Sequence, residues 1–267
     1  VKGDKMYKKL LLSTIVASAL SANLFAKNIN ESECGAKGDG YIFAGGECIN
    51  FYKADGEKPS SLIIVVHGSW AEGTNTLGRY SPFADNLAMA TDVTTIAVAL
   101  PSYSGSSSNK IGPLIHTDKR PLAATKEYVA FLGELIKKLK TKFNAKKVTF
   151  VGHSAGAMMG GTVLGLNPDL ATNAVLVGGR YDVHALNSDK SLISAIDVVD
   201  KISKNTKIAL VYGTKDTISE PKVTTDFFSL AKSKGLNVTL VEVPNGEHLD
   251  LDMTDESVNA IKKLLEE

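Results

Sequence analysis

The most informative stretch of the chain surrounds a serine that lies between two glycines. Residues 152–156 read Gly-His-Ser-Ala-Gly, the pattern G-x-S-x-G, and they follow a β-branched and aromatic run at 148–151. Between a strand and a helix, this pattern makes a tight turn that strains the serine and exposes its hydroxyl. The glycines leave room where side chains would crowd the adjacent helix and strand. The bare pattern also arises by chance in glycine-rich turns, so the prediction of Ser154 as a nucleophile depends on finding its partners.

A serine hydroxyl is a poor nucleophile at neutral pH and needs a neighbouring base. His248 is the best candidate, because it ends the segment Pro-Asn-Gly-Glu-His directly after the last predicted strand, 238–243. That position places it at the carboxyl edge of a parallel sheet. The other four histidines fit less well, two because they belong to neighbouring motifs and two because they are expected at the surface or rim: His67, His153, His116 and His184.

Strands and helices alternate along most of the chain, and this decides where such residues can meet. Short continuous apolar runs predict strands that are covered on both faces. Strands are expected at 61–66, 94–100, 148–151, 173–177, 207–212 and 238–243, with one or two edge strands within 41–53; helices are expected at 118–143, 156–165, 188–203, 221–234 and 255–266. Thr117 or Asp118 is expected to cap the first of these helices. The alternation predicts a parallel sheet with helices on both faces and binding loops at the carboxyl ends of the strands.

Four local motifs occur in an order that is typical of one family. They are His67-Gly68 after an early strand, the serine turn, Asp216 after the strand at 207–212, and His248 after the last strand. In these motifs the chain resembles the α/β-hydrolase family from about residue 60 to its end. The resemblance implies the α/β-hydrolase fold, with a mostly parallel central sheet and helices on both faces. Residues 178–206 leave room for one helix and its loops, so we expect no large lid domain and an open, shallow site.

The resemblance also implies an acid between the serine and the histidine in the chain. Asp216 fits, because Tyr-Gly-Thr-Lys-Asp at 212–216 follows the strand where the family usually places this residue. Its carboxylate would accept a hydrogen bond from the histidine and fix the tautomer of the ring. Asp182 is the competitor, since some relatives place the acid after the preceding strand. A helix or turn cap is the structural alternative for Asp216.

Two backbone N–H groups are expected to bind the oxyanion that forms during attack on a carbonyl. The resemblance implies that one belongs to Ala155, the residue after the nucleophile. The other is expected after Val-Val-His-Gly at 65–68, where Ser69 is the first choice and Trp70 the alternative. His67 would organise this loop rather than transfer protons.

Two aromatic residues are candidates for contact with the substrate. Trp70 is the one tryptophan of the chain and would lie beside the oxyanion site, either as a platform for the substrate or as a packed anchor of its loop. Tyr103 and the serines at 106–108 lie in a loop that ends at the same sheet edge. They are expected to line the cleft, although polar loops are usually only solvated.

The first residues have a different composition from the rest of the chain. Two lysines precede an apolar run at 10–20, and small residues follow up to Ala26. This order predicts a secretory signal peptide at 1–26, cleaved after Ala26 or Ala22, with Met6 as an alternative start. An uncleaved anchor is the other interpretation, but the run is short for a membrane span. A cleaved signal implies a secreted or periplasmic protein without stable membrane insertion.

The two cysteines, Cys34 and Cys48, follow this segment closely. Export to an oxidising compartment predicts a disulfide between them, which would hold together an N-terminal hairpin region at 27–60. Unpaired thiols are the alternative. Two cysteines are too few for a structural zinc site, and the serine motif already supplies a nucleophile. Residues 61–267 are expected to form the catalytic body, in one domain with the hairpin.

Composition limits the remaining classes of function. The 267 residues are 43% hydrophobic and 22% charged, which suffices for one sizeable core. The 30 basic and 29 acidic residues nearly balance and form no basic block, so nothing indicates a nucleic-acid partner.

The sequence therefore predicts an exported serine hydrolase that cleaves small or polymeric carboxylic esters, such as a carboxylesterase or a cutinase-like enzyme. The chemistry needs no metal or organic cofactor. A serine peptidase of the prolyl-oligopeptidase type is the nearest alternative, although its usual propeller domain is absent from the sequence. A lyase, a cofactor-free haloperoxidase or a non-catalytic binding protein on the same scaffold are further alternatives. Oligomeric state and substrate preference cannot be read from the sequence.

Overall fold

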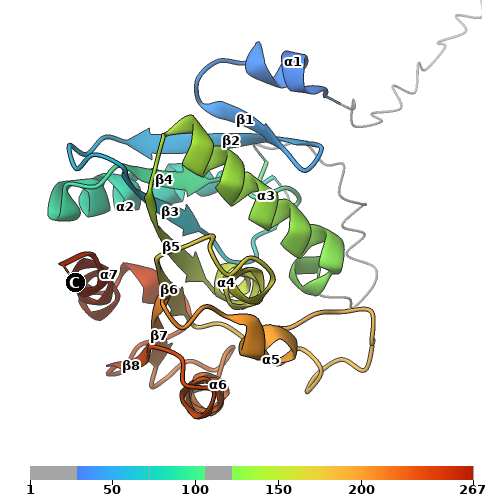
Figure 1. Ribbon diagram of the computed structural model, residues 1–267, viewed down its shortest axis with the longest axis vertical. Helices are drawn as coiled ribbons and strands as arrows, with labels where there is room; N and C mark the ends of the chain where they lie inside the picture. The colour runs from blue at the N-terminus through green and yellow to red at the C-terminus, as the bar shows by residue number, and fades with distance from the viewer. Residues whose placement is uncertain (1–28, 72, 106–121, 267) are drawn as a thin grey trace, which may run out of the picture.

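One eight-stranded sheet forms the centre of the molecule (Figure 1). The structure is a computed structural model that describes residues 29–71, 73–105 and 122–266. The strands are β1 (Tyr41–Ala44), β2 (Glu47–Ala54), β3 (Ser61–Val66), β4 (Thr95–Val98), β5 (Lys147–His153), β6 (Asn173–Val177), β7 (Lys207–Gly213) and β8 (Val238–Val243). Their order in the sheet is β1-β2-β4-β3-β5-β6-β7-β8. Strand β1 pairs antiparallel with β2, and β2 pairs antiparallel with β4. The other six strands, β3 to β8, are parallel to one another, as the alternation of strands and helices predicts.

Helices cover both faces of the sheet (Figure 1). The longer ones are α2 (Thr76–Thr91), α3 (Lys126–Lys142), α4 (Ala155–Leu166), α6 (Pro221–Ser233) and α7 (Asp255–Glu266). Strand β3 is apolar at nearly every position because both of its faces are covered. Its residues Leu62, Ile64 and Val66 belong to the core shared with α3, α4 and α6. Ile63 and Val65 point to the opposite face and belong to the core shared with α2 and α7. Successive side chains of a strand face opposite sides, so a strand between two helical layers needs apolar residues at every position.

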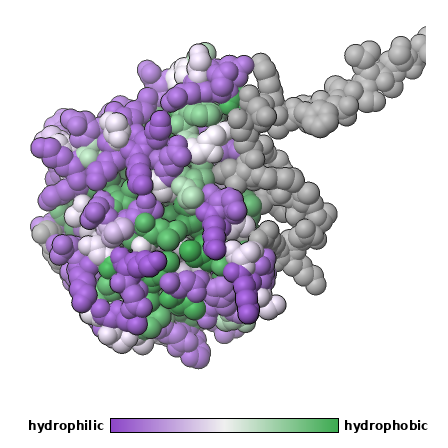
Figure 2. Space-filling view, turned by 45° about the vertical axis from the view of Figure 1, so that its right-hand side comes forward, coloured by the Kyte–Doolittle hydropathy of each residue, from purple (hydrophilic) through white to green (hydrophobic). Residues whose placement is uncertain are grey.

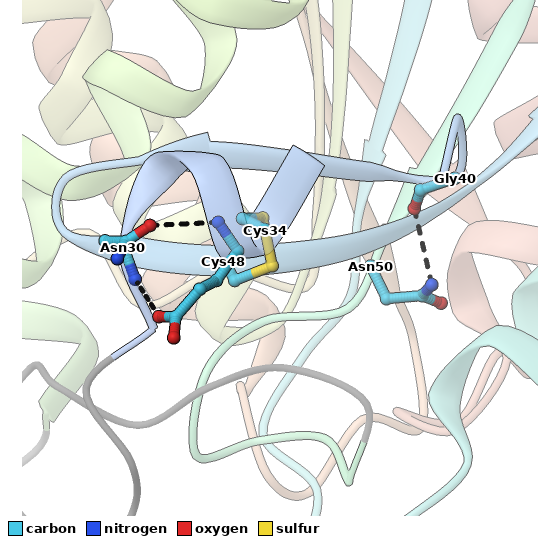
Figure 3. The surroundings of a disulfide bond; sticks show 6 residues. Asn30, Cys34, Gly40, Cys48 and Asn50 are labelled. Carbon is cyan, nitrogen blue, oxygen red and sulfur yellow. Dashed lines mark hydrogen bonds between the residues drawn. A yellow bond between two sulfur atoms is a disulfide. The ribbon is translucent and has the colours of Figure 1, made fainter. Parts of the chain in front are cut away.

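The disulfide predicted from the sequence joins Cys34 to Cys48 (Figure 3). Cys34 lies in the short helix α1 (Glu31–Gly35), and Cys48 lies in β2. Asn30 caps α1 by accepting a hydrogen bond from the N–H of Glu33, and the Glu33 carboxylate accepts one from the N–H of Asn30. The disulfide thus fixes a five-residue helix, which is too short to be stable alone, onto the β1–β2 hairpin. The hairpin joins the main sheet because β2 pairs with β4.

Helix α2 was not expected from the sequence. Its buried face consists of Tyr80, Phe83, Ala84, Leu87 and Ala88, which have the spacing of one helical face. A glycine and a proline within the helix weaken this pattern, because both residues disfavour a helix interior. Burial against β2 and β4 outweighs that cost.

Two expected helices are shorter than the sequence suggested. The segment predicted at 118–143 is helical from Lys126, where Thr125 rather than Thr117 or Asp118 supplies the cap. The segment predicted at 188–203 contains only α5 (Ala195–Val198) and a 3₁₀ turn. Side chains in its first half bond to the backbone nearby, as Asp189 does to the N–H of Ser191, and such bonds compete with a helix.

Between β6 and β7 the described chain carries only α5 and the 3₁₀ turn, so no large lid domain is inserted there. The predicted signal peptide at 1–26, with Met6, Ala22 and Ala26, lies outside the described residues, as do His116, the serines at 106–108 and the first residues of the helix predicted at 118. None of the helices in the described ranges is long and apolar enough to span a membrane.

Candidate active site

Ser154 lies at a sharp turn between β5 and α4, as the sequence motif predicts. Its φ of 54° and ψ of −116° are strained for a residue with a side chain. The turn is held because the N–H of Ser154 donates to the carbonyl of Val177 (2.8 Å). A Cβ on Gly152 would lie 2.6 Å from the carbonyl oxygen of Gly156, and a Cβ on Gly156 would overlap the carbonyl of Val66. Both glycines are therefore required by close packing of backbone on backbone.

Three side chains that are distant in the sequence form one hydrogen-bonded chain. The Nε2 atom of His248 lies 2.8 Å from the Oγ atom of Ser154, and its Nδ1 atom lies 2.7 Å from Oδ2 of Asp216. A carboxylate can only accept, so Nδ1 carries the proton and Nε2 is left to accept the serine proton. This is the arrangement needed to make the hydroxyl nucleophilic.

The carboxylate of Asp216 is buried and stays ionised. Burial by itself raises the pKa of this group, but the hydrogen bond from His248 and those from the N–H groups of Ser219 and Ile218 outweigh it and lower the pKa below its ordinary value. The competing acid, Asp182, accepts hydrogen bonds from the N–H groups of His184 and Ala185 instead. The structure thus brings Asp216 to His248 and uses Asp182 to hold a turn.

A cavity of about 200 Å³ lies beside the serine hydroxyl. The residues that line it are Ser69, Ser154, Ala155, Met158, Gly178, Arg180, Ile218, Ser219 and His248. Ala155 is the first residue of α4, where backbone N–H groups have no partner inside the helix. The loop after β3 passes close by, since a Cβ on Gly68 would lie 2.8 Å from the Cβ of Ser154. Both expected oxyanion donors, Ser69 and Ala155, therefore border the same space.

The two aromatic candidates do not belong to the described lining of this cavity. The Arg79 guanidinium lies over the ring of Trp70, 5.1 Å from its centroid, and the indole also contacts the Tyr80 hydroxyl. Tyr103 is buried against Tyr128, and its hydroxyl lies within hydrogen-bonding reach of the Ser69 side chain. Both surroundings favour an anchoring role for these rings, and contact with a substrate stays a prediction.

His67 connects the loops that follow β3 and β4. Its Nε2 atom accepts a hydrogen bond from the N–H of Leu100 (3.0 Å), so the ring is neutral and Nδ1 donates to the carbonyl of Gly68 (2.7 Å). Burial lowers the pKa of His67 to about 4, with a smaller contribution in the same direction from His153, while the bond to Gly68 acts in the opposite direction. A proton on Nε2 would face the Leu100 N–H and break this connection.

This geometry predicts that the protein loses stability as the pH falls from about 6.5 to 4. The pKa of His67 is about 4 when folded and about 6.5 when unfolded, so in this range the unfolded chain binds the proton first. His67 alone would account for a loss of up to about 3 kcal/mol in the free energy of unfolding. Urea denaturation of wild type and His67→Gln at pH 7, 5.5 and 4 checks this. Equal pH dependence in both proteins would contradict the assignment.

A second histidine and carboxylate lie directly behind His248, and the sequence analysis did not identify them as a pair. The rings of His153 and His248 are 5.1 Å apart, and Nε2 of His153 donates to the backbone carbonyl of His248 (2.8 Å). The remaining Nδ1 atom is 3.7 Å from Oδ1 of Asp252, too far for a hydrogen bond, and neither atom has a hydrogen-bond partner among the described residues. The pair supports the backbone that carries His248.

Comparison with known proteins agrees with this fold. A family model described as the alpha/beta hydrolase family matches residues 63–203, which is just over half of the chain. No curated protein matches the sequence. No group of three or more potential metal ligands occurs among the residues that the structure describes.

Several solved structures have the same fold. Esterase Pf2001 of Pyrococcus furiosus superposes with a TM-score of 0.63 at 15% identity, over 85% of this chain and 90% of that one. Est1E of Butyrivibrio proteoclasticus, solved with ferulic acid bound, gives a TM-score of 0.59 at 16% identity, over 84% and 97%. A putative dienelactone hydrolase of Klebsiella pneumoniae gives 0.59 at 21% identity, over 85% and 92%. From its fold and the matching family model, the chain belongs to the alpha/beta hydrolase family.

Proposed function

We propose that the protein is a serine hydrolase that cleaves carboxylic esters through a covalent acyl-enzyme. The observation that carries this proposal is the hydrogen-bonded chain from Ser154 Oγ through His248 to Asp216, at a strained turn beside a cavity. A strained, half-buried serine with a base and a third orienting group has the geometry of an activated nucleophile. Esterase Pf2001, one of the structural neighbours, agrees with this reaction class.

In the first half of the proposed reaction, Ser154 Oγ attacks the ester carbonyl carbon while His248 Nε2 takes the hydroxyl proton. The backbone N–H groups of Ala155 and Ser69 would donate to the oxyanion that forms. The negative charge of Asp216 stabilises the imidazolium, so the proton need not leave the histidine. When the tetrahedral intermediate collapses, the bond to the alcohol breaks and His248 returns its proton to the departing oxygen. The acyl group remains on Ser154.

In the second half, a water molecule takes the place of the alcohol. His248 removes one proton from the water, which attacks the acyl carbon, and the carboxylic acid leaves as Ser154 regains its proton. Esters are the favoured substrates because an alkoxide leaves more easily than an amine. We also propose that the protein is exported, with cleavage after Ala26. The Cys34–Cys48 disulfide is typical of oxidising compartments and supports this part of the proposal.

A fluorophosphonate probe tests the proposed nucleophile, because it forms a stable bond only with an activated serine. We expect one adduct per chain on the tryptic peptide that contains Ser154, and none after heat denaturation or in Ser154→Ala. The same preparation should release p-nitrophenol from p-nitrophenyl acetate but hardly any p-nitroaniline from peptide anilides. Labelling that persists in the alanine variant would assign the nucleophile elsewhere, and faster cleavage of the anilides would indicate a peptidase.

A further inference from the structure

A second and larger hollow lies next to the catalytic cavity. Its volume is about 530 Å³, against about 200 Å³ for the cavity at Ser154. We call it the α6 groove, and the residues that line it are Arg180, Tyr181, Asp182, Ala185, Leu186, Ile196, Thr217, Ile218, Glu220, Val223, Asp226, Phe227 and Leu230. Arg180 and Ile218 line both hollows. The two hollows are therefore adjacent, with these two residues at the boundary between them.

The boundary between the hollows is held by the loops that carry the catalytic acid. The guanidinium of Arg180 donates through Nε to the carbonyl of Ile218 (3.1 Å), and Nη2 donates to the same oxygen. The N–H groups of Ile218 and Ser219 donate to Asp216, and Ser219 Oγ donates to the carbonyl of Gly179 (3.0 Å). These bonds join the loop after β6 to the loop after β7. The boundary thus has a fixed position relative to the reacting atoms.

The chemistry of the groove favours a neutral, apolar occupant. Its floor is the stacked ring pair Tyr181 and Phe227, with centroids 4.4 Å apart. Ile218 at the boundary is 55% exposed, and Leu186, also in the lining, is 69% exposed. Large apolar side chains gathered at a hollow commonly mark a ligand site. On the face of the molecule that Figure 2 draws, hydrophobic side chains reach the surface among hydrophilic ones.

The charged groups of the groove argue against an anionic ligand. Three carboxylates line it, and the guanidinium of Arg180 is committed to the carbonyl of Ile218. Asp226 forms an ion pair with Lys222, and Asp182 accepts backbone hydrogen bonds. Both carboxylates therefore stay negatively charged without needing a ligand as a partner. An anion in the groove would meet these carboxylates without a free cation among the described lining residues.

We propose that the α6 groove binds the apolar arm of the ester, which crosses the Arg180–Ile218 boundary while the ester carbonyl lies at Ser154. This inference rests on the proposed function and assigns its substrate class: esters with an extended, uncharged acyl or alkyl chain. Each methylene that leaves water contributes about 0.8 kcal/mol, which corresponds to about a fourfold gain in kcat/KM at most. The ratio of kcat/KM for a long-chain ester to that for the acetate is therefore expected to rise steeply once the chain is too long for the cavity at Ser154.

Two substrate series test the proposal and distinguish the two arms. In p-nitrophenyl acetate, butyrate, octanoate and decanoate the acyl chain grows, whereas in butyl, octyl and decyl acetate the alcohol grows. We expect kcat/KM of the wild type to rise at least tenfold along one of these series. The series that rises identifies the arm. A flat response in both series, with acetate hydrolysis intact, would overturn the groove proposal and leave the esterase proposal standing. Absent acetate hydrolysis and absent fluorophosphonate labelling would instead defeat the esterase proposal.

Two groove variants and one matched control locate the effect. Val223→Trp fills the groove from α6, and Leu186→Asp places a charge in its lining at a position that is exposed and therefore contributes little to folding. Each is expected to lower the octanoate-to-acetate ratio of kcat/KM, or the corresponding alkyl ratio, at least tenfold. Ser229→Trp adds the same ring to an exposed α6 position outside the groove lining and should leave the ratio unchanged. An unchanged ratio in both groove variants would overturn the proposal.

Discussion

Replacing Ser154 by alanine is expected to lower kcat for p-nitrophenyl acetate by about 10⁶-fold, the loss typical of removing an activated nucleophile. The reason is geometric: the Oγ atom of Ser154 is the atom that His248 Nε2 approaches to 2.8 Å. Without it, His248 can only activate water, and the remaining rate comes from the oxyanion donors and substrate binding. Initial rates of both proteins, with the wild-type enzyme concentration set by active-site titration, give the ratio of the two kcat values. An unchanged melting temperature of the variant would show that its fold is intact.

Two serine controls separate this loss from a general effect of removing a hydroxyl. Ser69→Ala keeps its backbone N–H, so its loss should stay well below the roughly 100-fold that removal of an oxyanion donor costs. Ser229→Ala changes an exposed position on α6 and should be neutral. A Ser154→Ala protein with more than a few per cent of wild-type activity would rule out the acyl-enzyme mechanism.

Asp216→Asn is expected to lower kcat by about 10⁴-fold while the protein stays folded. Oδ1 of Asp216 accepts hydrogen bonds from the N–H groups of Ile218 and Ser219, and an asparagine oxygen can keep both. The amide nitrogen then takes the place of Oδ2 and faces His248 Nδ1 as a donor. The ring must respond by accepting at Nδ1, which moves its proton to Nε2. In that tautomer His248 cannot remove the proton of Ser154.

The matched control is Asp182→Asn, which changes the other candidate acid in the same way. Within the described chain, the hydrogen bonds that Asp182 accepts come from the N–H groups of His184 and Ala185 in its own turn. The kcat of Asp182→Asn on the acetate ester should therefore fall by less than about tenfold. Rates and the pH dependence of kcat/KM should be measured for both variants. The assignment of the acid would be reversed if Asp182→Asn proved the more damaging substitution.

The sequence predicts the fold because the fold depends on local patterns, and the same patterns explain why the proposed Ser154, Asp216 and His248 come together. A serine turn between a strand and a helix is recognisable from a few residues. His248 and Asp216 could be found because each follows a strand, and parallel strands bring their carboxyl ends to one edge. The choice between Asp216 and Asp182 stayed open, because it depends on which side chain its own loop turns toward the histidine.

Features that depend on packing between distant segments could not be predicted. The His153–Asp252 pair and the Arg180–Ile218 boundary join residues whose individual types carry no signal in the sequence. Helix α2 shows a related limit: its apolar spacing is regular, but Pro82 lies inside it, and only contact with the sheet decides the outcome. Tertiary burial routinely overrides local propensity in this way.

The short span between the two cysteines bears on how the chain assembles during synthesis. Their separation of 14 residues means that the cross-link needs nothing from the remaining polypeptide, and closing so short a loop costs little chain entropy. An N-terminal hairpin closed first would present β2 as a ready edge on which β4 aligns, with Phe51 opposite Val98. The proposed nucleophile Ser154, acid Asp216 and base His248 follow β5, β7 and β8, so they are completed in that order. On the proposed function, a chain that ends before β8 lacks His248 and is expected to be inactive.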